Sequence, residues 1–189
     1  MIHKVRHILT GLFILTFLSL SNSVSAQLNN EVLILVNQVR TDPERFLNEQ
    51  LLPYLKIHSI NTRDSRSLIR TLKNYKPTIA LKQFSKLDQM AQDYADEAGS
   101  KGWINHRKTG QRFKNYAPEM EFTGENLQFG LETAMDIVID LLIDEGVPDH
   151  GHRKNILDEN FQYFGFGFAP HKNYDTISVL LFGGKVNMD

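Results

Sequence analysis

Two histidines and one glutamate are the residues of this chain best placed to do chemistry, although they lie far apart in the sequence. His106 stands in a segment with too few apolar residues to belong to a core, and His152 stands where a helix is expected to begin. Glu125 is flanked by the apolar residues Phe122 and Leu127, so its carboxylate is expected to be partly buried. A buried carboxylate needs a partner, and histidine is a natural one.

This set of side chains is compatible with two kinds of site. Two imidazoles and a carboxylate can hold zinc with a water molecule in the open position, as catalytic zinc sites do. The same groups can instead form a hydrogen-bonded structural cluster. No HExxH pattern is present, and the spacing alone leaves both interpretations open.

Covalent catalysis is less well supported, because the chain has no GxSxG, GxGxxG or Walker motif. Nothing in the sequence places a base beside an unmarked serine such as Ser100. His58 lies in a polar segment and His171 in a turn, so nothing in their context favours a role as ligand over that of an ordinary surface or structural histidine.

The spacing of apolar residues predicts several helices, which must position the two histidines and the glutamate. Asp42 followed by Pro43 is a standard helix start, and Ser85 with Asp88 has the arrangement of a capping box. The expected helices run from about Asn29 to Arg40, from Pro43 to Leu51, from Ser85 to a stop at Gly102 and from Thr133 to Gly146.

The remaining segments are expected to differ in character. Residues 52–78 are mostly polar and predict a surface excursion, with only a weak helical stretch at Leu68 to Tyr75. Residues 164–168 and 177–182 predict a β-hairpin, in which Gly165 and Gly167 alternate with phenylalanines and leave one face for another backbone or a helix. Helices first and strands last indicate an α+β domain with helices covering an antiparallel sheet.

The first 26 residues have the features of a signal peptide. Lys4 and Arg6 give a positive start, residues 8–20 form an apolar run, and small residues at 24–26 precede Gln27. The apolar run is shorter than the roughly 20 residues that a membrane-spanning helix needs, which favours cleavage over an anchor. We therefore expect a secreted or periplasmic protein, with one domain over residues 27–189 and no membrane span after cleavage.

Charge and cysteine content exclude further classes. Cleavage removes Lys4 and Arg6 but no acidic residue, so 19 basic residues face 22 acidic ones and the net charge of the remaining chain is −3. This weak acidity, without a long basic run, argues against nucleic acid or an anionic membrane as the main partner. The chain has no cysteine, which excludes disulfides, thiolate metal ligands and a cysteine nucleophile.

Several segments in a fixed order resemble the CAP superfamily of cysteine-rich secretory, antigen 5 and pathogenesis-related-1 proteins, in particular its short bacterial branch. The segments with most weight are the GEN motif that holds Glu125 and the GHR motif that holds His152. The full series comprises residues 35–40, residues 87–98, His106 with Gly110, residues 124–127, residues 151–157, residues 164–167 and residues 181–184.

The resemblance implies an α-β-α sandwich with a central antiparallel sheet and a cleft lined by two histidines and two acids. His106, Glu125 and His152 take three of these places by motif position. Asp144 is the favoured fourth residue, with Glu145 as the alternative. In some relatives such a cleft binds zinc or another divalent cation, so His106, His152 and Asp144 are the implied metal ligands.

Three functions follow from this resemblance as hypotheses. The first is a binding module for a lipid, a peptide or a cell-wall fragment. The second is a metal-dependent hydrolase or peptidase in which Glu125 acts as the general base on metal-bound water. The third is a structural cluster that only satisfies its own hydrogen bonds.

Overall fold

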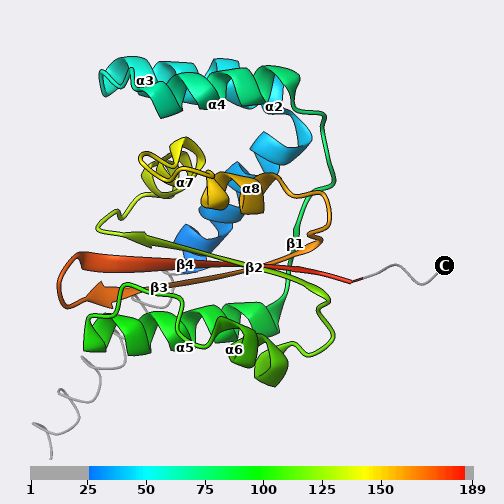
Figure 1. Ribbon diagram of the computed structural model, residues 1–189, viewed down its shortest axis with the longest axis vertical. Coiled ribbons are helices and arrows are strands. Elements are labelled where there is room, and N and C mark those ends of the chain that lie inside the picture. The colour runs from blue at the N-terminus through cyan, green and yellow to red at the C-terminus, as the bar shows by residue number, and fades with distance from the viewer. Residues whose placement is uncertain (1–25, 186–189) are drawn as a thin grey trace, which may run out of the picture.

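A four-stranded sheet lies between layers of helices in the computed structural model, which describes residues 26–185 (Figure 1). The predicted signal peptide, apart from its last residue, lies outside the described residues. Within the described range no helix combines the length and the apolar character that crossing a bilayer requires. The elements are a helix over residues 26–41, α2 (Pro43–Phe46), η1 (Leu47–Leu51), α3 (Leu52–Ile57), α4 (Arg63–Asn74), β1 (Lys82–Gln83), α5 (Ser85–Lys101), α6 (Thr109–Tyr116), β2 (Phe122–Phe129), α7 (Ala134–Ile143), α8 (Gly151–Leu157), β3 (Tyr163–His171) and β4 (Asp175–Gly184).

The strand order of the sheet is β1-β3-β4-β2. The predicted hairpin is confirmed as β3 and β4, and β2 pairs with β4 in the antiparallel sense. The short strand β1 adds a parallel pair at the other edge. The predicted α+β class and α-β-α sandwich are therefore confirmed, with β2 as an edge strand.

The two faces of the sheet pack against different helices. Phe164 and Phe166 of β3 face the core that contains the helix over residues 26–41, α7 and α8. Gly165 and Gly167 face α5, where a methyl group on either glycine would overlap the helix backbone. The predicted close approach of another element to these glycines is thus confirmed, and the approaching element is α5 (Figure 1).

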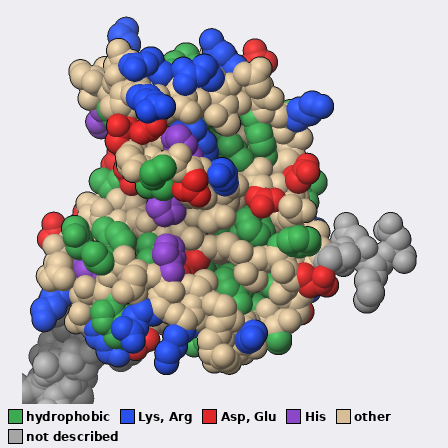
Figure 2. All heavy atoms as spheres, viewed as in Figure 1, with side chains coloured by type: hydrophobic (Ala, Val, Ile, Leu, Met, Phe, Trp, Pro, Cys, Tyr) green, Lys and Arg blue, Asp and Glu red, His purple; other side chains and the backbone are tan. Residues whose placement is uncertain are grey.

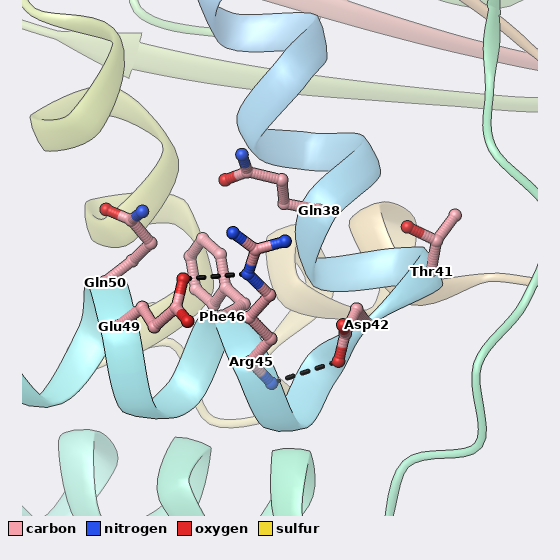
Figure 3. Close-up of a pocket in the computed structure, with 7 residues that line it drawn as sticks. All are labelled: Gln38, Thr41, Asp42, Arg45, Phe46, Glu49 and Gln50. Atoms are coloured by element: carbon pink, nitrogen blue, oxygen red, sulfur yellow. Dashed lines mark hydrogen bonds and ion pairs between the residues drawn. The ribbon is translucent and has the colours of Figure 1, made fainter.

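The second predicted helix begins where expected and ends later. The carboxylate of Asp42 accepts a hydrogen bond from the backbone N–H of Arg45, and Figure 3 shows the side chain of Asp42 beside this first turn. A hollow of about 250 Å³ lies here, but exposed polar side chains make up most of its lining, including the ion pair of Arg45 and Glu49. Helical structure continues through η1 and α3 to Ile57, beyond the predicted end at Leu51.

The prediction of a surface excursion over residues 52–78 is wrong. Thr62 and Ser65 form a capping box that starts α4, and Leu68 and Leu72 of this helix are almost completely buried. The apolar residues are few, but their spacing puts them on one helix face against the rest of the core. Figure 1 shows α3 and α4 in an outer layer beyond α7 and α8, and α4 packs against α2 and η1 there.

The predicted capping box at the start of α5 is also wrong. Phe84 is the residue before the first turn, and no side chain caps the helix. The carboxylate of Asp88 instead accepts hydrogen bonds from the side chain of Gln83 and from the backbone N–H of Phe166 in β3. The predicted stop at Gly102 is confirmed by its left-handed φ of 70°.

Candidate functional site

Strand β2 places Glu125 on the side of the sheet that α5 covers. Successive side chains of a strand point to opposite faces, so Glu125 and Leu127 share the face of α5, while Asn126 faces α8. The Glu125 side chain is only 2% exposed. The predicted burial of this carboxylate is therefore confirmed.

His106 is the partner of Glu125. Its Nδ1 lies 2.8 Å from Oε1 of Glu125, and the Thr109 hydroxyl lies at the same distance from this oxygen. Nη2 of Arg112 lies 2.6 Å from the other oxygen, Oε2, as an ion pair without the alignment of a hydrogen bond. The imidazole itself is half exposed, so this pair has a buried acid and an accessible base.

The loop that carries His106 is fixed by Tyr94 of α5, which is buried. The Tyr94 hydroxyl donates a hydrogen bond to the carbonyl of Asn105 and accepts one from the N–H of Arg107. The Arg112 guanidinium lies over the Tyr94 ring, 3.6 Å from its centroid. Helix α5 thus sets the position of His106 through the residues on either side of it.

His152 forms a second pair, with Asp144. Nδ1 of His152 lies 2.7 Å from Oδ1 of Asp144, while Oδ2 accepts the backbone N–H of His152 at 2.9 Å. Asp144 ends α7 in the left-handed conformation with a φ of 56°, which aspartate tolerates better than most residues. This conformation turns its carboxylate back toward the first turn of α8.

The structure therefore separates the two acids that the sequence left as alternatives. Asp144 faces His152 and its side chain is 1% exposed. Glu145 points elsewhere, because its carboxylate accepts a hydrogen bond from the hydroxyl of Thr62. Asp144, the favoured residue, is the one that joins the candidate site.

The neighbours of the motif residues, Asn126 and Arg153, brace the loops. Asn126 donates a hydrogen bond to the carbonyl of His152 and accepts one from Asn155. Arg153 is buried and donates to the carbonyls of Leu142 and Ile143 at the end of α7. These contacts hold α7, α8 and the edge of β2 together around the second pair.

Both pairs share one chemical arrangement. A carboxylate that accepts from Nδ1 fixes the neutral ring in the tautomer whose Nε2 carries a lone pair. Neither Nε2 has a hydrogen-bond partner within residues 26–185. Figure 2 shows histidine side chains in a line down the middle of one face of the molecule, where a ligand can reach them.

The predicted metal set of His106, His152 and Asp144 does not fit this arrangement. Among residues 26–185, no group of three or more histidine, cysteine, aspartate or glutamate side chains is placed to hold a metal ion. Both oxygens of Asp144 are occupied by His152 and the first turn of α8. Glu125, the predicted general base, is held by His106 and Thr109 at Oε1 and by the ion pair with Arg112 at Oε2.

Burial and hydrogen bonding act in opposite directions on the two acids. Burial raises the pKa of Glu125, but its contacts with His106, Arg112 and Thr109 outweigh this and leave the pKa below its ordinary value. Burial likewise raises the pKa of Asp144, and the hydrogen bonds from His152 and the backbone of α8 bring the pKa below its ordinary value. Both side chains are therefore carboxylates at neutral pH.

These lowered pKa values predict acid sensitivity of the fold. A group with a lowered folded-state pKa stabilises the protein above its unfolded pKa, about 4 for these acids, and this stability is lost as the pH falls through the folded value. We expect the free energy of unfolding in urea to fall below pH 5, and to fall less steeply in Asp144→Asn. An equally steep fall in that variant would contradict this assignment.

Thr109 and Arg112 are partners of Glu125 that sequence reasoning missed. Their positions in α6, three residues apart, are the available signal, because this spacing places both on one side of a helix. A third histidine–acid contact was also missed, in which Nε2 of His150 lies 3.2 Å from Oδ1 of Asp64. Asp64 lies on α4, in the segment predicted to be an excursion.

Solved structures with a similar fold include bacterial proteins. An outer surface protein from Borrelia burgdorferi is 24% identical, with a TM-score of 0.48, over 67% of this chain and 96% of that one. An extracellular protein with an SCP domain from Bacillus anthracis is 20% identical, with a TM-score of 0.47, over 67% of this chain and 45% of that one. NaASP2 with Zn2+ has a TM-score of 0.50 at 13% identity, over 87% of this chain and 83% of that one.

The family assignment rests on a comparison with family models. No curated protein matches the chain at a significant level. The model of the cysteine-rich secretory protein family, CAP, matches residues 33–182, which contain both histidine–acid pairs and the whole sheet apart from its last two residues. The chain, although it has no cysteine, therefore belongs to the cysteine-rich secretory protein family.

Proposed function

We propose that the protein is an exported binding module, secreted or periplasmic, which holds a peptide or a cell-wall fragment against its two histidine–acid pairs. The observation that carries this proposal is the shared geometry of the pairs: each buried carboxylate orients an imidazole through Nδ1, and the two imidazole side chains are 50% and 27% exposed. A lone pair at Nε2 accepts a hydrogen bond from a hydroxyl or an amide N–H. Glycans and peptides carry such donors, whereas an apolar lipid does not.

The alternative of a metal-dependent hydrolase has less support. It requires a free general base and a metal held by at least one carboxylate, but Glu125 and Asp144 are both engaged with their own histidines. The likeness to NaASP2 with Zn2+, at 13% identity, concerns the fold alone. Binding without turnover is therefore the function that we propose.

The proposal is tested by calorimetric titration of the chain from Gln27 with soluble cell-wall fragments and with peptides. We expect saturable binding that weakens by about ten-fold or more in His106→Ala/His152→Ala, because each lost hydrogen bond contributes about 1 kcal/mol. His58→Ala is the matched control, since His58 is exposed and stacks on Tyr54 at the far end of α3.

Three outcomes of the same experiment would contradict the proposal. The first is equal binding by the wild type and the double variant. The second is turnover in a peptidase and esterase screen. The third is stoichiometric zinc binding that the double variant loses, which would instead support the metal-dependent alternative.

A further inference from the structure

A strongly basic surface covers α3 and α4, at the end of the molecule farthest from the sheet (Figure 1). Residues 52–78 carry six lysines and arginines and one aspartate, a net charge of +5 in a chain whose total is −1. All six basic side chains are exposed, and Figure 2 shows Lys and Arg side chains gathered over these two helices. We call them the basic face: Lys56, Arg63, Arg66, Arg70, Lys73 and Lys76.

The helical repeat of α4 aligns four of these charges. Arg63, Arg66, Arg70 and Lys73 follow one another at intervals of three and four residues, which places them on one side of the helix. They extend over about 15 Å of its axis. Leu68 and Leu72 occupy the opposite, buried side, so the fold holds this row of charges toward solvent.

The charges of the basic face are left without ion pairs in the described part of the chain. None of the six side chains forms an ion pair with any residue between 26 and 185. Asp64, the acid of this segment, is held away by hydrogen bonds from the N–H of Gly146 and from His150. The positive electrostatic potential of the basic face is thus available to an anionic partner in the solvent.

Exposed apolar side chains on the same segment indicate which anionic partner fits. Ile57, at the end of α3, is 77% exposed, the highest value among the large apolar residues that the structure describes, and Leu52 is 40% exposed. A soluble polyanion offers nothing to these side chains. A membrane surface offers both anionic headgroups for the charges and an acyl boundary for the apolar groups.

We propose that the basic face, together with Ile57 and Leu52, docks on membranes that contain anionic phospholipids. Arginine suits this partner because its guanidinium can bind a phosphate with two parallel hydrogen bonds. The weak acidity of the whole chain masks this surface, because the rest of the sequence carries a net charge of −6. The net charge of the whole chain argues against an anionic membrane as a partner. The local charge of the basic face nevertheless suits such a membrane.

The test is flotation with vesicles, using the chain from Gln27, which contains both hydrophobic cores but not the apolar N-terminal run. We expect binding to vesicles of phosphatidylglycerol with phosphatidylcholine, and none to phosphatidylcholine alone. The variant Arg63→Gln/Arg66→Gln/Arg70→Gln/Lys73→Gln should lose roughly 100-fold or more in partitioning, since each basic residue contributes about five-fold near an anionic surface. Raised salt should weaken binding as well.

The matched control is Lys82→Gln/Lys108→Gln/Lys114→Gln/Lys172→Gln, which removes the same charge from exposed positions elsewhere and should still bind. Ile57→Ser should reduce partitioning by about ten-fold, because it removes an apolar side chain from the acyl boundary. Equal losses in the two quadruple variants would overturn the proposal. So would an unchanged Ile57→Ser variant that binds soluble polyphosphate as tightly as vesicles.

Discussion

Replacing Arg40 by methionine should lower the free energy of unfolding by about 3–5 kcal/mol, because it leaves several buried carbonyl groups without a partner. Arg40 is completely buried, and its guanidinium donates hydrogen bonds to the carbonyls of four residues: Ile79, Ile156, Asp158 and Phe161. Burial lowers the pKa of this guanidinium, but arginine remains charged at neutral pH. The methionine side chain fills part of the space and donates nothing.

Urea unfolding followed by circular dichroism measures this loss. The control is Arg70→Met on the exposed side of α4, which should change the stability by less than about 0.5 kcal/mol. A similar small change in Arg40→Met would show that the four carbonyls find other partners. Because two of these carbonyls belong to the end of α8 and the turn after it, we also expect Arg40→Met to weaken ligand binding at His152.

The part of the site that could be predicted from the sequence is the part that local context determines. Glu125 between apolar residues had to be buried, and a buried carboxylate had to find a partner, which is His106. The start of α8 beside His152 was also visible, because Gly146 and Pro148 end the preceding segment. The metal-ligand role came only from a resemblance, and the hydrogen bonds of Asp144 give no support to it.

Strand β2 was not predicted, and its residues explain why. Glu125, Asn126 and Gln128 are polar yet buried, so the strand lacks the alternation of apolar and polar residues that marks a half-buried strand. Phe122, the apolar residue that opens the strand, is 40% exposed. Because polar residues that serve the candidate site occupy buried positions of β2, its sequence lacks the alternation that predicts a strand.

The layer formed by α3 and α4 could not be predicted from the average polarity of residues 52–78. Its buried apolar residues are only three leucines, Leu55, Leu68 and Leu72, and the six basic residues of the segment outnumber them. The capping box of Thr62 and Ser65 departs from the usual pattern, in which the second residue is glutamate or glutamine. The basic residues that led to the prediction of a surface excursion form the exposed face of α4.

Replacing Gly167 by alanine should destabilise the protein by about 3 kcal/mol or more, because the added methyl group overlaps a helix backbone, which cannot rotate away as a side chain can. The new methyl carbon would overlap the carbonyl group of Ala91 and lie 2.5 Å from the N of Gln92 in α5. These atoms belong to the helix backbone, so α5 itself must move away from β3. Gly110→Ala is the matched control: no atom lies within 4 Å of its added methyl, and alanine favours the helix α6.

This displacement should also reach the candidate site, although Gly167 does not touch it. Gln92 hydrogen-bonds both the N–H and the carbonyl of Phe168, and these contacts fix α5 along β3. Tyr94, two residues further along the same helix, holds the loop of His106. We therefore expect Gly167→Ala to weaken ligand binding as well as stability, in a variant that still folds at low temperature. Lowered stability with wild-type binding in Gly167→Ala would mean that α5 does not set the position of His106, because the helix would have moved without moving the imidazole. Wild-type stability would contradict the predicted overlap with the backbone of α5.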